Sequence, residues 1–230
     1  MAGGHSAWSN GINLNTIEAA SDPAQESLEN INAVNDIFKA AFSAEKVTIA
    51  APQVNSGAGR AMAALACAYV WSHRKVVLKP HYKSIGLHGS EYRTHFLPKR
   101  VGHKKAHHLT KACMPVSAQS AAAMGMIDRI LTQDRSTFMY RVLQQGIILV
   151  QDYTVIEKIV SPKCQERTEQ WHDMMELVCH FKLTIMRENF SNSENIQEQK
   201  QFFNKIKPTS TPLHITLNQY RPPHIFEGEN

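Results

Sequence analysis

The spacing of apolar residues divides the first eighty residues into helices and short strands. Between Ser27 and Phe42 apolar residues recur at helical spacing, and Asp22-Pro23 just before them is typical of a helix start. The runs Val47 to Ala51 and Lys75 to Lys79 are apolar and rich in β-branched residues, which predicts strands. The small-residue run Ala58 to Tyr69 predicts a helix between them. This order predicts an α/β fold with right-handed crossovers and a parallel sheet buried on both sides.

The pattern after residue 80 predicts shorter helices separated by loops. A short helix is expected to start near Ser90, which could cap it, and residues 106–113 are expected to form another. Val116-Ser117 is expected to cap an alanine helix over 118–124, and Gly125 is expected to end it. An extended run follows at 126–131, so this part of the chain continues the α/β pattern.

The pattern changes after residue 134. Residues 135–151 and 164–189 read as long helices with charged faces, separated by Ser161-Pro162. The last forty residues contain four prolines and are expected to wrap the surface or stay partly loose, whereas residues 1–15 read as a loop. We therefore divide the chain into a core over 1–134, a helical region over 135–192 and a proline-containing tail over 193–230.

Composition narrows the class of protein. With 43% hydrophobic residues the chain reads as globular rather than disordered. No apolar run is long enough to span a membrane, and no secretory signal is recognisable at the start. The four cysteines are widely spaced, which is typical of thiols in a reducing compartment. The expected location is the cytoplasm, with no membrane partner.

The formal net charge of +5 is concentrated in one basic segment, Lys99-Arg100 to Lys104-Lys105, which is surrounded by histidines. One interpretation is a solvated helix face, and the other is a site for an anion such as a nucleotide phosphate. Aromatic residues are not interleaved with these charges, so a nucleic-acid partner is not expected. His103, His107 and His108 could supply two metal ligands at helical spacing, but no further ligand is indicated, so no metal is expected.

A glycine turn, Asn55-Ser-Gly-Ala-Gly59, lies between the first predicted strand and the next helix. Such a turn leaves backbone N–H groups unpaired at the helix start, where they can hold a phosphate or the oxygen of a polarised carbonyl. Many such turns are simply tight connections between a strand and a helix. Downstream, residues 80–102 hold polar groups at a density unusual for a core: His81, Tyr82, His88, Glu91, Tyr92 and His95.

Several motifs carry a resemblance to a known family. Residues 8–14 (Trp-Ser-Asn-Gly-Ile-Asn-Leu), the turn 55–59 and residues 121–128 (Ala-Ala-Ala-Met-Gly-Met-Ile-Asp) are spaced as in the enoyl-CoA hydratase (crotonase) superfamily. More narrowly, residues 9–20, residues 80–92 (Pro-His-Tyr-Lys-Ser-Ile-Gly-Leu-His-Gly-Ser-Glu-Tyr) and residues 207–214 resemble the C-terminal half of the HypX (HoxX) family of hydrogenase-maturation proteins.

This resemblance implies a crotonase-like spiral of ββα units followed by a helical C-terminal region. Met1 would fall inside the core, so the opening strands of the fold and a formyltransferase domain would be missing from this sequence. The implied ligand is a CoA thioester whose carbonyl oxygen accepts the N–H groups of Ile12 and Gly59. The resemblance places the following residues at the substrate: Asn10, Gly11, Asn55, Gly57, Arg60 and His81.

The resemblance also implies a reaction. The two glutamates that a hydratase needs are replaced here by Ala61 and by His81 or its neighbours, so enoyl-CoA hydration is not expected. In HypX-like proteins a formyl group passes from formyl-tetrahydrofolate to CoA, and the crotonase-like half then releases carbon monoxide, the iron ligand of nickel–iron hydrogenase. By position, Glu91 could abstract the formyl proton, and Tyr82 could hydrogen-bond the substrate or protonate the leaving sulfur.

The sequence departs from the family pattern at a few positions. Arg60 replaces the usual glycine after the turn, where it could contact CoA phosphates or block the pocket. His88, Arg93 and His95 stand where aromatic residues are expected. Two other functions therefore stay open: a generic CoA-ester isomerase or hydrolase, and a non-catalytic interaction module that needs a partner to complete its sheet.

Overall fold

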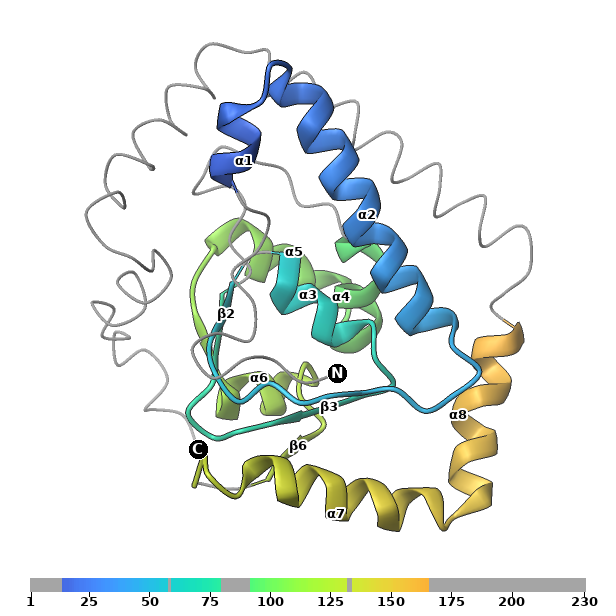
Figure 1. Ribbon diagram of the computed structural model, residues 1–230. Coiled ribbons are helices and arrows are strands. Elements are labelled where there is room, and N and C mark those ends of the chain that lie inside the picture. Colours follow the sequence, from blue (N-terminus) through green and yellow to red (C-terminus); the bar gives the residue numbers. More distant parts are fainter. Residues whose placement is uncertain (1–13, 58, 80–91, 132–133, 166–230) are drawn as a thin grey trace.

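The computed structural model describes residues 14–57, 59–79, 92–131 and 134–165 (Figure 1). The described chain begins with two helices, α1 (Leu14–Ala19) and α2 (Pro23–Ser43). The Asp22 carboxylate accepts the backbone N–H groups of Ala24 and Gln25 at 3.1 and 3.0 Å, which caps α2 and confirms the predicted helix start. Helix α1 begins one residue before the end of the expected N-terminal loop.

The strands form two small sheets. The first contains β1 (Ile49–Ala50), β3 (Tyr69–Ser72) and β6 (Arg129–Ile130), all parallel, in the order β1-β3-β6. The second contains β2 (Ser56–Gly57), β4 (Val77–Lys79) and β5 (Val116–Ser117), in the order β2-β4-β5.

The expectation of one fully parallel sheet is therefore wrong. Strand β2 is parallel to β4, but β5 is antiparallel to β4. Pro52 follows β1 and has no N–H for a sheet ladder. Its carbonyl instead accepts the N–H of His73 at the end of β3, at 3.0 Å. The chain thus leaves the first sheet at Pro52 and pairs again in the second at β2.

The helix predicted over 58–69 is shorter than expected. Helix α3 spans Gly59–Leu65, and Tyr69 already belongs to strand β3. Two side chains distant in sequence hold the start of this strand: Thr48 Oγ1 accepts the N–H of Ala68 at 3.0 Å, and Asp128 Oδ2 accepts that of Val70 at 2.6 Å. Tertiary contacts therefore override the local helical pattern.

Three helices follow: α4 (Arg93–Val101), α5 (His103–Ala112) and α6 (Ala118–Met124). Gly102, at φ +80°, separates the first two and donates its N–H to Pro98. The predicted ends of α6 are confirmed, because Ser117 Oγ accepts the N–H of Ser120 and Gly125 closes the helix at φ +90°. Ser90, the expected cap of α4, lies outside the described residues; Tyr92 occupies the N-cap position.

Two groups of buried side chains hold these elements together. The larger joins α3, α4 and β4, and its largest members are Met62, Leu78, Phe96, Leu97 and Met126. The smaller joins α7 (Phe138–Val150) to the first sheet, through Phe138, Val142, Ala51 and Trp71. Helix α7 thus packs on the sheet that contains β1 and β3.

Helix α8 (Tyr153–Gln165) contacts α7 and α2 (Figure 1). It runs through Ser161-Pro162, so the expectation that these residues separate two helices is wrong. None of the described helices is long and apolar enough to cross a membrane.

Gly125→Ala is expected to lower the free energy of unfolding by about 1–2 kcal/mol or more, measured by urea denaturation. The residue has φ +90°, and an added Cβ would meet the carbonyl oxygen of Arg100 at 2.8 Å. Gly146→Ala, inside helix α7, is the matched control, because the added Cβ would lie 3.9 Å from the Ile49 side chain, at an ordinary contact distance. The control is expected to stabilise the protein slightly. Equal effects of both substitutions would contradict the assigned role of Gly125.

Candidate functional site

The predicted glycine turn joins a buried strand end to a helix start. Strand β2 ends at Gly57 and helix α3 starts at Gly59, and the structure buries both residues. The first N–H groups of a helix have no acceptor within that helix. Gly59 is the first residue of α3, so its N–H has no acceptor within that helix. Arg60 lies in the first turn of α3, and its side chain lies outside the described part of the structure.

Asn55 anchors this turn. Its Oδ1 accepts the backbone N–H of Val77 at 2.9 Å, which ties the residue before β2 to the start of β4. The side-chain oxygen of Asn55, which was predicted to bind substrate, therefore holds two strands together. Its contribution to the site is to hold the glycine turn at a fixed position beside β4.

The pairing of β2 with β4 brings the next candidate segment to the turn. The two strands are parallel, with Ser56 opposite Leu78 and Gly57 opposite Lys79. Because the carboxyl ends of parallel strands meet at the same edge, the chain that leaves β4 starts beside Gly57. This chain continues into residues 80–91, which carry His81, Tyr82 and Glu91. Those three residues lie outside the described structure, as do Asn10, Gly11 and Ile12.

The other end of the 80–91 segment is also fixed. Tyr92 is buried, and its ring lies 6.1 Å from that of Phe96 on helix α4. Helix α4 in turn packs against α3, the helix that begins at Gly59. Tyr92 has φ +49°, in the left-handed region that side chains rarely adopt. Such strained residues are common at functional sites, and this one directly follows Glu91.

Lys79 adds a charge that the sequence reasoning missed. It is the last residue of β4, directly opposite Gly57. Burial lowers the pKa of its amine, and an electrostatic interaction with the Cys113 sulfur opposes that shift. The available sequence signal was a lysine at the end of an otherwise apolar strand. The backbone of Lys79 thus lies beside Gly57, and its partly buried amine lies near Cys113.

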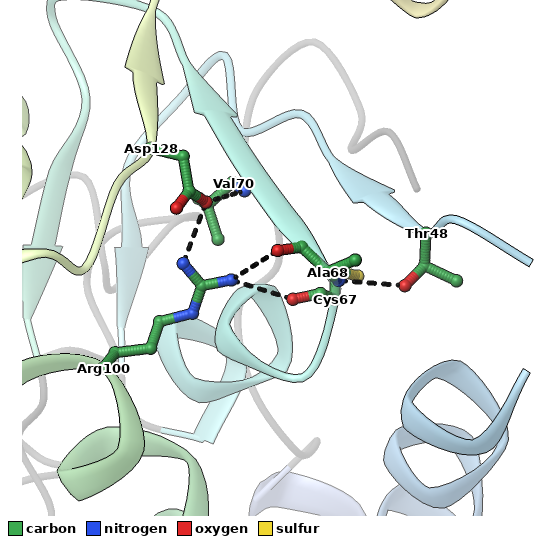
Figure 2. A network of polar contacts seen from close by, with 6 residues as sticks. All are labelled: Thr48, Cys67, Ala68, Val70, Arg100 and Asp128. Atoms are coloured by element: carbon green, nitrogen blue, oxygen red, sulfur yellow. Dashed lines mark hydrogen bonds and ion pairs between the residues drawn. The ribbon is translucent and has the colours of Figure 1, made fainter. Parts of the chain in front are cut away.

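Arg100 connects helix α4 to the end of α3 (Figure 2). Its Nη1 lies 2.8 Å from Asp128 Oδ2, and its Nη2 donates to the carbonyls of Cys67 and Ala68 at 2.8 and 3.1 Å. The same Asp128 oxygen accepts the N–H of Val70. The Arg100 side chain is only 12% exposed, so including it in a solvated basic face was wrong. These contacts fix α4 against α3 and β3.

The described residues contain no group of three or more His, Cys, Asp or Glu side chains that could hold a metal ion. His103, His107 and His108 lie exposed on α5. The described residues therefore offer no metal site near the glycine turn.

Comparison with protein families gives a match over most of the chain. The family described as "Enoyl-CoA hydratase/isomerase" matches residues 1–208. Among curated proteins, the hydrogenase maturation factor HoxX of Bradyrhizobium diazoefficiens is 29% identical over 225 residues, covering 96% of this chain and 40% of HoxX.

Solved structures of HypX and of enoyl-CoA hydratases are also similar to this chain. A double variant of HypX from Aquifex aeolicus is 34% identical with a TM-score of 0.81, over 87% of this chain and 36% of HypX. HypX in complex with tetrahydrofolic acid is 33% identical with the same TM-score, over 96% and 40%. An enoyl-CoA hydratase from Bacillus halodurans, 16% identical, shares the fold with a TM-score of 0.73 over 86% of this chain and 78% of its own. The chain spans about two fifths of the length of HoxX and HypX.

Proposed function

This chain belongs to the enoyl-CoA hydratase/isomerase (crotonase) family, and from that premise we propose that it is a lyase module which converts formyl-CoA to carbon monoxide and CoA. The proposal places this reaction in the maturation of nickel–iron hydrogenase. Its support is the similarity to HoxX, named as a hydrogenase maturation factor, and to HypX.

The observation that carries the proposal is the register of β2 against β4. Gly57, two residues before Gly59, lies opposite Lys79, and the segment that contains His81, Tyr82 and Glu91 begins directly after Lys79. A thioester carbonyl bound at the N–H of Gly59 would therefore lie close to the polar residues that the reaction requires. Asn55 and the packing of α4 on α3 keep both ends of this arrangement in place.

The proposed reaction uses these groups in sequence. The thioester oxygen accepts the N–H groups of Gly59 and Ile12, which polarises the carbonyl and makes the formyl hydrogen more acidic. Glu91 abstracts the formyl proton, the carbon–sulfur bond breaks, and its electron pair leaves with sulfur. Tyr82 donates a proton to the departing thiolate. The products are carbon monoxide and CoA, and no oxidant or reductant is consumed.

Hydration of an enoyl-CoA fits these residues less well. That reaction needs two carboxylates to activate water and deliver a proton. In this chain Ala61 occupies one of the expected positions, and it is fully buried in α3. The other position falls at His81 or its neighbours, so the pair of carboxylates is absent from the sequence.

The formyl-CoA substrate implies a partner reaction. We infer that a formyltransferase which uses formyl-tetrahydrofolate supplies the formyl group to CoA. The HypX structure in complex with tetrahydrofolic acid is consistent with a folate-dependent step in that protein. The remaining CoA-binding contacts are proposed for Asn10, Gly11, Gly57, Arg60 and His81.

The test uses the full chain with formyl-CoA, following carbon monoxide by its absorbance on ferrous myoglobin and free CoA by a thiol reagent. Both products are expected in equal amounts, with no carbon monoxide from acetyl-CoA. CoA release without carbon monoxide would indicate thioester hydrolysis instead. No turnover by a folded chain whose thermal midpoint CoA fails to raise would favour a non-catalytic interaction module.

A further inference from the structure

The net positive charge of the chain comes from one segment. Residues 92–127 contain six Lys and Arg residues and no Asp or Glu, whereas the remaining residues contain 19 basic and 20 acidic ones. In the fold this segment forms helices α4, α5 and α6. The charge excess is therefore a property of one part of the molecule, and helix α5 carries half of its Lys and Arg residues.

The lysines of helix α5 are exposed to solvent. Its buried residues are Ala106 and Leu109, and the helix packs against α4. Figure 1 shows where α5 lies in the fold. Lys104, His107, His108 and Lys111 are all exposed and are spaced by three or four residues, so they are neighbours on one side of the helix. We call these four residues the α5 face.

The fold itself does not account for the α5 face. The first turn of α5 carries no acidic residue and begins His103-Lys104-Lys105, although cations are unfavourable at the positive end of a helix. Gly102 supplies no side-chain cap. Neither Lys104 nor Lys111 has an acidic residue three or four positions away that could pair with it on the helix. Arg100 differs, because it forms an ion pair and two further hydrogen bonds. None of the ion pairs found within the described residues involves the α5 face.

We propose that the α5 face is a docking surface for an acidic segment of a partner protein. Helix α5 has ten residues and is about 15 Å long, which suits a short segment with several Asp or Glu side chains. Carboxylates placed there would pair with the two lysines and complement the helix dipole.

Other anionic partners fit the α5 face less well. A single-stranded nucleic acid stacks mainly on Phe, Tyr and Trp side chains between the charges, and α5 contains none of these three. A membrane-surface helix inserts large apolar side chains, whereas the large apolar residue of α5, Leu109, is buried against the protein.

The test compares two charge-reversed variants of the full chain that have the same net charge. K104E/K111E alters the α5 face, and R74E/K75E alters two exposed residues in the turn between β3 and β4. A fluorescent oligoglutamate peptide is the probe, oligoglutamine is its control, and binding is read by anisotropy. We expect K104E/K111E to weaken oligoglutamate binding about ten-fold or more and R74E/K75E about two-fold or less. Binding should also weaken between about 50 and 500 mM salt.

Three results would overturn the proposal. One is an equal loss of affinity in both variants, with both still folded by circular dichroism. Another is no oligoglutamate binding by the unmodified chain at low salt. The third is tighter binding to a short DNA duplex or to phosphatidylserine vesicles, lost in K104E/K111E, because the surface would then serve a different class of partner.

Discussion

Glu91→Gln is expected to slow carbon monoxide release from formyl-CoA by about 10²–10⁴-fold, because the amide cannot accept the formyl proton. The thioester carbonyl would still bind the N–H of Gly59, so CoA should raise the thermal midpoint of the variant and of the unmodified chain to the same extent. The rate is measured as myoglobin-bound carbon monoxide under saturating formyl-CoA, which separates chemistry from binding.

The matched control for this substitution is Glu157→Gln. Glu157 is exposed on helix α8, and the same charge is removed there. The control should leave the rate of carbon monoxide release within about two-fold, because surface changes rarely perturb a distant reaction. If Glu91→Gln retained the full rate while the protein stayed folded, the proton would be removed by another group.

Sequence patterns predict the elements whose end signals are local. Helix α2 is recognisable because Asp22 caps it through residues two and three positions away. Helix α6 is recognisable because Ser117 and Gly125 close it on either side. In both cases the hydrogen bonds that define the helix are formed by its immediate neighbours in sequence. The crotonase-like fold itself was predicted from motifs, and the comparisons confirm it.

Strand β3 shows why other elements were missed. Tyr69 to Ser72 follow an alanine-rich helix without a glycine or proline between them, so the apolar pattern continues. The strand exists because β1 and β6 flank it and because Asp128, 58 residues later, accepts the N–H of Val70. Several strands have only two residues, which is too short for any periodicity.

Some features of the candidate site could likewise be predicted from local sequence signals, and others could not. The glycine turn could be predicted, since glycines between a strand and a helix are a local signal. The tie between Asn55 and Val77 spans 22 residues and could not be predicted. The role of Arg100 was even harder to predict, because a buried arginine and a solvated one look alike in a sequence. Its partners lie 28 to 33 residues away.

Arg100→Met is expected to lower the free energy of unfolding by about 2–4 kcal/mol. The methionine keeps much of the apolar stem but removes the donors to Asp128, Cys67 and Ala68. The carbonyls of Cys67 and Ala68 then lose a charged donor in a partly buried position, and Asp128 loses its ion-pair partner. Asp128 is 33% exposed, so water compensates part of that loss and the effect stays below that of a fully buried pair. Urea denaturation measures the change.

The control and a double-mutant cycle make this prediction specific. Lys105→Met, on the exposed side of α5, removes the same charge without removing a described contact and should change stability by less than about 0.5 kcal/mol. Asp128→Asn keeps an acceptor for Val70, so it should cost less than Arg100→Met. The double variant should show a coupling of about 1 kcal/mol or more, because the two side chains are in direct contact. Additive effects would show that the ion pair itself contributes nothing, and that the carbonyl contacts alone join α4 to the end of α3.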